Sequence, residues 1–180
     1  VLYPAGKVSP FQEAQMATVG GNVTAVRVGG VFDDCQRLVK AALANPDLAP
    51  QRLTSANSIN IGRLLPQLFY YVSAQLAAAA APSDAVAFVV PSGNLGNLTA
   101  GVMAATMGLP VSRFVAATNA NDVLPAYLES GTFRPRPSIP TISNAMDVGD
   151  PSNFARLAAI YGSSAPRMRA AITGIRVTEA

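Results

Sequence analysis

The sequence predicts an α/β protein with a mostly parallel sheet and flanking helices. Segments with strand character alternate along the 180 residues with segments of helical periodicity, which is the pattern of crossover units that feed a parallel sheet. One strand segment, residues 85–90, is also a continuous apolar run of the kind found in interior parallel strands. Because half of the residues are apolar, the chain can bury a sizeable core, and we expect a single compact unit.

The first part of the chain predicts two strands and one helix. Residues 1–4 resemble the end of a strand, and the apolar and polar alternation of residues 22–28 predicts another. A helix follows over residues 32–44, because apolar residues recur at intervals of three and four, and Asn45-Pro46 ends it. Cys35 falls on the apolar face of this helix, so we expect a small core hydrophobe rather than a reactive thiol.

The rest of the chain predicts a helix followed by two strand, loop and helix units. A long, half-buried helix begins near Ser58 and runs into an alanine-rich stretch that ends at Pro82. The later segments are, in order, a strand at 85–90, a loop at 92–97, a helix at 98–107, a strand at 111–117, a polar loop at 118–122, a helix at 123–131, an extended linker at 134–137, a loop at 143–152 and a helix at about 153–161. From Gly162 onward the sequence has no clear pattern.

Composition excludes several classes of function. The net charge of +3 rests on 13 Lys and Arg without a cluster, so we expect no nucleic-acid partner. The apolar run at residues 76–81 is too short to cross a membrane, and we expect a cytoplasmic protein without a metal site. The chain has no histidine and two lysines, Lys7 and Lys40. The commonest general base is therefore missing.

The strongest local signal for chemistry is the loop that follows the apolar strand. Glycines in a loop between a strand and a helix let backbone N–H groups converge on an anion at the positive end of the helix. The residues of this candidate phosphate site are Gly93, Asn94, Leu95, Gly96 and Asn97. The loop lacks the spacing of nucleotide and dinucleotide motifs. The alternative is a tight turn that needs glycine for close packing.

A second candidate anion site lies at residues 54–63, where hydroxyls, amides and an arginine surround the start of the next predicted helix. If Ser58 is the N-cap, its hydroxyl, the free N–H groups and Arg63 could converge on one phosphate or carboxylate. The alternative is plain helix capping. Two such sites suggest a phosphorylated cofactor beside a phosphorylated substrate, both at the carboxyl edge of the strands.

The acids and tyrosines have simpler interpretations. Asp33 and Asp34 are expected at a helix start, and Glu129 on the surface. Asp122 and Asp147 lie in polar loops after strands, where a role stays open, although Asp122 could simply cap the following helix. Packing within a helix is expected of two residues, Tyr70 and Tyr71.

Seven motifs, in this order, carry a resemblance to a known family: 1–10, Gly20-Gly21-Asn22, 32–36, 54–63, 91–97, 117–122 and 143–149. Over roughly residues 1–161 the chain resembles threonine synthase of the bacterial and fungal type. The resemblance implies the tryptophan-synthase β-like (fold type II) fold of pyridoxal-phosphate enzymes. It also implies conversion of O-phospho-L-homoserine and water to L-threonine and phosphate.

By this resemblance, residues 93–97 hold the phosphate of pyridoxal 5'-phosphate through their backbone, and Asn57, Ser58 and Arg63 belong to the substrate-phosphate motif. The Schiff-base lysine belongs to a motif that neither lysine of this chain occupies. We therefore expect residues 1–180 to be a central fragment of the catalytic domain, with no catalytic residue and no activity alone. The rivals are another fold type II enzyme such as threonine dehydratase, and a non-catalytic anion-binding module. The oligomeric state stays open.

Overall fold

The computed structural model describes residues 1–81 and 83–178 and divides into two compact units, Val1–Ser55 and Ala56–Ala180. The expectation of a single compact unit is therefore wrong. Two features explain the division. Residues 53–56 have no regular secondary structure, and the first unit buries few apolar side chains, Tyr3 and Cys35 among them. No helix in the described parts of the chain is long and apolar enough to cross a membrane.

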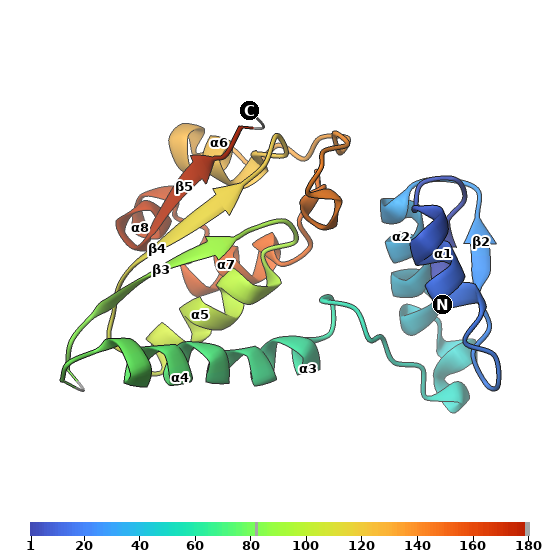
Figure 1. Cartoon of the computed structure of the whole chain (residues 1–180), viewed down its shortest axis with the longest axis horizontal. Helices are drawn as coiled ribbons and strands as arrows, with labels where there is room; N and C mark the ends of the chain where they lie inside the picture. Colours follow the sequence, from blue (N-terminus) through green and yellow to red (C-terminus); the bar gives the residue numbers. More distant parts are fainter. Residues whose placement is uncertain (82, 179–180) are drawn as a thin grey trace. The chain divides into compact units, whose positions relative to one another are not determined.

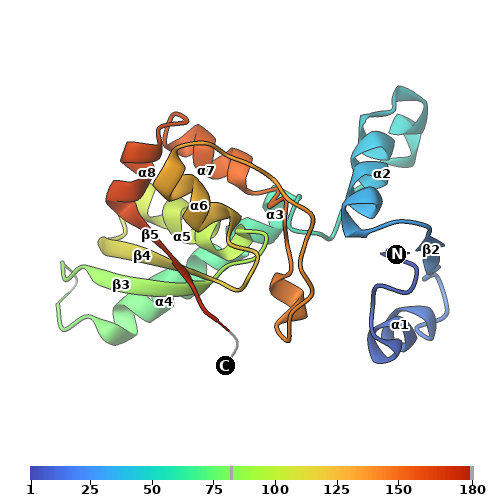
Figure 2. The ribbon, with the colours of Figure 1, turned by 90° about the horizontal axis from the view of Figure 1, so that it is seen from above.

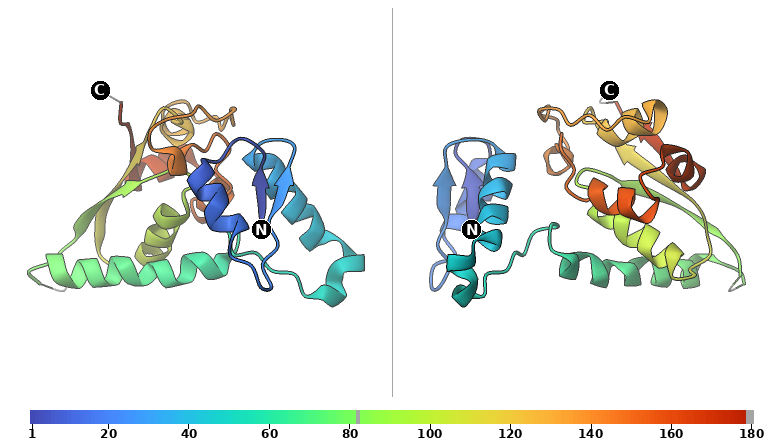
Figure 3. Two further views of the ribbon diagram at one scale, coloured as in Figure 1. Left: turned by 45° about the vertical axis from the view of Figure 1, so that its right-hand side comes forward. Right: turned by 180° about the vertical axis from the view of Figure 1, so that it is seen from behind.

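The first unit is a two-stranded parallel sheet with helices (Figure 3). Its elements are β1 (Leu2–Pro4), α1 (Pro10–Ala17), β2 (Val26–Val28), α2 (Phe32–Ala44) and the 3₁₀ helix η1 (Pro46–Gln51). The predicted helix over residues 32–44 is confirmed, and Cys35 is only 4% exposed, so that burial raises the pKa of its thiol. Helix α1 was not predicted, although Ser9 and Gln12 form a capping box at its start.

The second unit is a three-stranded parallel sheet in the order β3, β4, β5 (Figure 1). The strands are β3 (Val86–Pro91), β4 (Val111–Thr118) and β5 (Ile172–Arg176). The helices are α3 (Ile61–Leu64), η2 (Leu65–Gln67), α4 (Leu68–Ala78), α5 (Gly96–Thr106), α6 (Val123–Ser130), η3 (Asn144–Met146), α7 (Phe154–Ile160) and α8 (Ala165–Ala171). In this unit α7 packs against α5, and α6 and α8 pack against β5 (Figure 2). The α/β class with parallel strands is confirmed.

Three predicted elements differ from the structure. The helix expected near residue 58 is three successive pieces, α3, η2 and α4, along one nearly common axis (Figure 3). Pro66 interrupts it, because proline has no N–H to donate to the preceding turn. Its expected end at Pro82 lies outside the described residues. Among the described strands β3 is an outer rather than an interior one, and Val89 is 67% exposed. The unassigned stretch after Gly162 contains α8 and β5.

Helix α5 lies against both α4 and β4, and its small residues make this possible. A β-carbon built on Gly101 would lie 2.5 Å from Tyr71 Cζ and 2.7 Å from Phe114 Cε1. Glycine at this position therefore lets both rings reach the helix backbone. Tyr71, Phe88 and Phe114 pack with one another behind it.

Parallel pairing fixes where the loops of the second unit emerge. Because Pro91 of β3 is in register with Ala117 of β4, the loops after these two strands leave the same edge of the sheet. Ser92 confirms the alignment, since its N–H donates to the carbonyl of Ala117 at 2.7 Å. The polar residues that follow β3 and β4 consequently share one edge, which is the usual ligand edge of α/β proteins.

Candidate anion-binding site

The glycine loop, residues 92–95, joins β3 to α5 through one left-handed residue. Leu95 is the N-cap of α5 with φ 60° and ψ 11°, and no side chain caps the helix there. The first bond of the helix runs from Thr99 N–H to the carbonyl of Leu95 at 2.9 Å. The N–H groups of the residues just before Thr99 consequently have no partner inside the helix.

The backbone of this loop offers several free donors. In the part of the chain that the structure describes, no backbone carbonyl accepts a hydrogen bond from the N–H groups of Gly93 to Leu98. These groups stand at the amino end of an 11-residue helix, where the peptide dipoles add a positive partial charge. Free N–H groups and a positive helix end are the two features that bind phosphate. The loop therefore fits the phosphate of pyridoxal phosphate.

The two glycines of the loop have different surroundings. A β-carbon on Gly93 would lie 2.8 Å from Met146 Cα, so the loop around η3 packs directly on this glycine. At Gly96 the same atom would lie 3.5 Å from Ser58 Cβ and from Asn153 Nδ2, which is ordinary contact. Neither glycine has a positive φ. The close-packing alternative therefore applies to Gly93 but does not explain Gly96.

The second candidate segment lies directly beside the glycine loop. Asn94 Nδ2 donates to Ser58 Oγ, and Ser58 Oγ donates to Asn57 Oδ1 at 3.0 Å. Ser58 is not the N-cap of the next helix. That position belongs to Asn60, whose Oδ1 accepts from Gly62 N–H at 2.9 Å, because helix α3 begins only at Ile61. Ser58 instead contacts the start of α5.

Arg63 is exposed and lies in the last turn of α3. Its guanidinium donates to the carbonyl of Ala56, two residues before Ser58. The side chain therefore folds back onto the segment that carries Ser58. The structure thus brings Ser58 to the glycine loop and Arg63 to the Ser58 segment.

Two polar residues that the sequence analysis did not single out hold Asn94 in place. Ser152 donates to Asn94 Oδ1 through its N–H at 2.6 Å and through its hydroxyl at 3.0 Å. Asn153 Nδ2 donates to the carbonyl of Asn94 at 2.9 Å, and Asn153 is fully buried. Serine and asparagine just before a helix are usually expected to cap that helix. The side chain of Asn153, however, makes no cap hydrogen bond. The sequence therefore offered no specific signal for their role.

Asn97 is held by a buried tyrosine. Tyr71 Oη lies 2.9 Å from the carbonyl of Asn97 and 2.7 Å from its Oδ1, and Asn97 Nδ2 donates to Gln67 Oε1 at 3.0 Å. Burial raises the pKa of Tyr71, so its hydroxyl keeps the proton it donates. Packing was expected for both neighbouring tyrosines. It is found for Tyr71, whereas Tyr70 is 64% exposed.

The remaining acids are used in the structure itself. Asp147 accepts from Asn119 Nδ2 at 2.8 Å and from Thr141 Oγ1 at 2.7 Å, and so ties the loop after β4 to the following one. Asp122 is the N-cap residue of α6, but its side chain makes no cap hydrogen bond and its carboxylate pairs with Arg136. In α2, Asp34 accepts from Val31 N–H at 2.8 Å, which together with Arg37 lowers its pKa. Among the described residues, no three Asp, Glu, Cys or His side chains lie close enough together to hold a metal ion.

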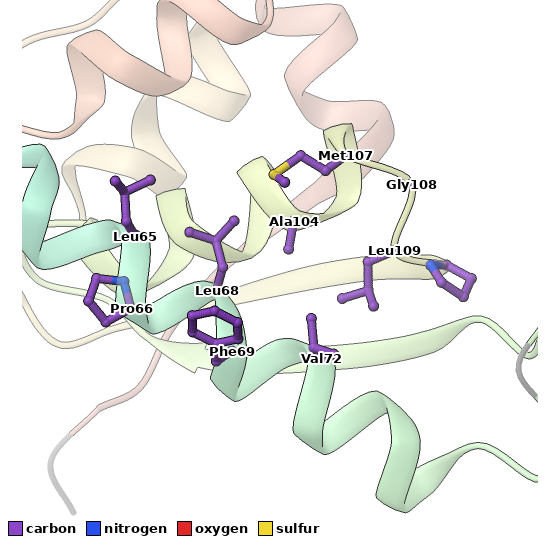
Figure 4. Close-up of a pocket in the computed structure, with 10 residues that line it drawn as sticks. Leu65, Pro66, Leu68, Phe69, Val72, Ala104, Met107, Gly108 and Leu109 are labelled. Atoms are coloured by element: carbon purple, nitrogen blue, oxygen red, sulfur yellow. The ribbon is translucent and has the colours of Figure 1, made fainter.

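One hollow of the second unit is apolar and lies elsewhere. It is lined by Leu65, Pro66, Leu68, Phe69, Val72, Ala104, Met107, Gly108, Leu109 and Pro110 (Figure 4). Gly108 to Pro110 directly precede β4, so the hollow lies toward the amino ends of the strands. It contains no charged residue and lies away from the glycine loop, and it is therefore no candidate for the anion.

The parallel sheet and the glycine loop at its carboxyl edge are features of a defined class of enzyme. The chain belongs to the pyridoxal-phosphate dependent enzyme family, whose model matches residues 1–172. Several of its relatives are threonine synthases. Those of Haemophilus influenzae and Escherichia coli are 50% and 47% identical over 162 residues, which is 89% of this chain and 38% of each relative. The chain thus spans well under half of the length of these relatives.

Solved structures give the same result. The crystal structure of threonine synthase from Escherichia coli matches with a TM-score of 0.86 and 43% identity over 98% of this chain and 41% of that one. The pyridoxal-phosphate-bound threonine synthase of Brucella melitensis matches with a TM-score of 0.79 and 37% identity over 98% and 44%. Maize serine racemase, at 16% identity and a TM-score of 0.57, shares the fold alone. The predicted fold type II architecture is confirmed.

Proposed function

We propose that the full-length protein is a threonine synthase, which converts O-phospho-L-homoserine and water to L-threonine and phosphate. Residues 1–180 form the central part of its catalytic domain and carry both phosphate subsites. The observation that carries this proposal is the hydrogen bond from Asn94 to Ser58, which joins the glycine loop to a second segment rich in donors. A cytoplasmic location agrees with the free thiol of Cys35.

The cofactor assignment is made to the backbone of residues 93–97. Their unpaired N–H groups would hold the phosphate of pyridoxal phosphate, while the side chain of Asn94 is committed to Ser58 and Ser152. When bound, the cofactor supplies an electron sink for negative charge that develops on the substrate. The lysine that binds it covalently is expected outside these 180 residues, since Lys7 and Lys40 are exposed and neither occupies the motif that the resemblance assigns to it.

The substrate-phosphate assignment is made to Asn57, Ser58 and Arg63. Ser58 offers a hydroxyl, and Arg63 offers a guanidinium, which binds phosphate with two parallel hydrogen bonds. A non-phosphorylated substrate, such as that of a threonine dehydratase, would give this arginine no anion to bind. The phosphate therefore distinguishes the two enzymes.

The test is an assay of the purified full-length protein with O-phosphohomoserine, in which threonine and phosphate should appear in equal amounts. Arg63→Ala should raise the KM for this substrate about 10- to 100-fold, since a hydrogen bond to a charged group contributes about 1.5–3 kcal/mol. The Kd for pyridoxal phosphate should change little. Arg134→Ala, which removes another exposed arginine, is the control and should leave both values unchanged.

Three outcomes would contradict the proposal. Loss of the cofactor in Arg63→Ala with an unchanged KM would reverse the two phosphate assignments. Deamination of threonine without turnover of O-phosphohomoserine would indicate a dehydratase. Binding of phosphate with no turnover of either substrate would indicate a non-catalytic module.

A further inference from the structure

Arg156 connects segments that lie far apart in the sequence. It projects from α7, and its guanidinium donates through Nη2 to the carbonyl of Ile59 at 2.6 Å, across 97 positions of the chain. Its Nη1 donates to Asn153 Oδ1 at 2.5 Å. One planar group thus binds both the residue that follows Ser58 and the buried asparagine before α7.

These bonds complete a ring around the candidate site. Asn153 donates to the carbonyl of Asn94 at 2.9 Å, and Asn94 Nδ2 donates to Ser58 Oγ. The peptide from Ser58 to Ile59 then leads back to Arg156. Every step of the ring is either a hydrogen bond or a covalent link. A shift of the Ser58 segment against the glycine loop would therefore break at least one of these hydrogen bonds.

We propose that Arg156 is a positioning residue that sets the distance between the Ser58 hydroxyl and the N–H groups of the glycine loop. This inference depends on the proposed function, in which those two groups bind two phosphates. Arg156 itself contacts neither group, because both of its described bonds end on Asn153 and Ile59. Its effect on both ligands is indirect and simultaneous.

The geometry requires arginine rather than any cation. The acceptors are a neutral carbonyl and a neutral amide oxygen, so the number and direction of the donors matter more than the charge. The guanidinium holds its N–H groups in a rigid plane and can bind two acceptors at fixed positions, whereas a lysine ammonium on a flexible chain cannot. Arg156→Lys should consequently restore only part of the function.

The experiment compares Arg156→Met, Arg156→Lys and Arg156→Gln in the full-length protein. Arg113→Met is the matched control. Arg113, like Arg156, makes hydrogen bonds to residues far away in the sequence: it donates to the carbonyl of Ala170 at 3.3 Å and to the hydroxyl of Thr173 at 2.9 Å. It lies near the start of β4, away from the glycine loop. The measurements are the Kd for pyridoxal phosphate, the KM and kcat for O-phosphohomoserine, the ³¹P resonance of the bound cofactor and the urea midpoint.

The expected result is a joint change in both ligands. Arg156→Met should raise the cofactor Kd and the substrate KM each about 10-fold, because about one net hydrogen bond is lost. It should also shift the ³¹P resonance of the bound cofactor. Arg156→Lys should give intermediate values. Arg113→Met should lower the urea midpoint but leave the affinities and the resonance unchanged. If Arg156→Met fails to fold, Arg156→Gln replaces it in these measurements, because its side-chain amide keeps one hydrogen-bond donor group.

Unchanged affinities and resonance in Arg156 variants that lose stability would overturn the inference and leave a structural role alone. A change in only one ligand would also overturn it, since the ring joins both segments. If the wild type neither binds pyridoxal phosphate nor makes threonine, the proposed function fails separately. Titration of the wild type and of Arg156→Met with inorganic phosphate then decides. Weaker phosphate binding by Arg156→Met than by the wild type supports the inference, and equal binding by the two proteins overturns it.

Discussion

Leu95 stores backbone strain at the entrance to α5. Its φ of 60° is in the left-handed region, which costs a residue with a β-carbon about 1–2 kcal/mol. Its side chain is only 3% exposed, and burial of a leucine contributes about 1.5–3 kcal/mol. Packing of this one side chain therefore offsets the strain. The glycines of the loop differ in this respect, since a β-carbon on Gly93 would meet the backbone of Met146, whereas one on Gly96 would make only ordinary contacts.

Gly96 offers the cleanest test of the cofactor-phosphate assignment. In the full-length protein, Gly96→Asp should weaken pyridoxal phosphate about 100-fold or more, because a carboxylate a few ångströms from a phosphate costs several kcal/mol at a partly screened site. The free energy of unfolding should stay within about 1 kcal/mol, since a carboxylate is favourable in the first turn of a helix. The measurements are equilibrium dialysis with the cofactor and urea denaturation of the apoprotein.

Gly96→Ala is the control, because its methyl group has room at 3.5 Å from its neighbours. It should retain both stability and most of the affinity. If Gly96→Asp binds the cofactor as well as Gly96→Ala does, the loop is a packing turn only. Gly93 does not permit this comparison, since even alanine there would meet the backbone of Met146 at 2.8 Å.

At the residue scale, the sequence predicted which residues come together but not how. The glycine loop and Ser58 were expected at one edge of the sheet, and they share a hydrogen bond through Asn94. The roles of Asn153 and Arg156 were not predictable, because both depend on contacts with residues 59 to 97 positions away. No local pattern encodes such a separation. Polar residues near a helix start have the same sequence signature whether they cap that helix or bind another segment.

At the scale of elements, α5 depends on the absence of a side chain at Gly101. The ring of Tyr71 occupies the space where a β-carbon would be, and the same tyrosine binds Asn97 in the first turn. Packing in the middle of the helix and the position of its first turn are therefore linked through one residue.

Gly101→Ala should lower the free energy of unfolding by about 1–3 kcal/mol, the usual cost of overpacking a core. This loss should occur although alanine favours a helix by about 1 kcal/mol over glycine. Urea denaturation beside Gly96→Ala, in the same helix, measures it. An increase in stability would mean that the rings of Tyr71 and Phe114 move aside without cost, and that the small residue is not required for packing.

Elements were predictable where the local signals agreed. Helix α2 and strand β4 agree with the sequence because periodicity, caps and apolar runs all favour the same element. The continuous helix from Ser58 was wrong, because apolar spacing continued through Pro66 while the backbone could not. The exposed face of β3 was also not predictable, since an apolar run does not show how many of its faces are covered.

At the scale of the whole molecule, the two lysines and the glycine loop belong to different units. Lys7 and Lys40 lie in Val1–Ser55, and the loop lies in Ala56–Ala180. Both lysines are exposed, and neither occupies the motif to which the resemblance assigns the Schiff-base lysine.

The covalent attachment of the cofactor should therefore be found outside residues 1–180. When the full-length protein is loaded with pyridoxal phosphate, reduced with borohydride and digested, mass spectrometry should locate the pyridoxyl group on a lysine that is neither Lys7 nor Lys40. Lys7→Arg and Lys40→Arg should each retain the visible absorbance of the bound cofactor and the rate of threonine formation, because arginine preserves the surface charge but cannot form the linkage. Label on either residue, with loss of absorbance in the corresponding variant, would place the covalent centre in the first unit and contradict the division of roles proposed for this chain.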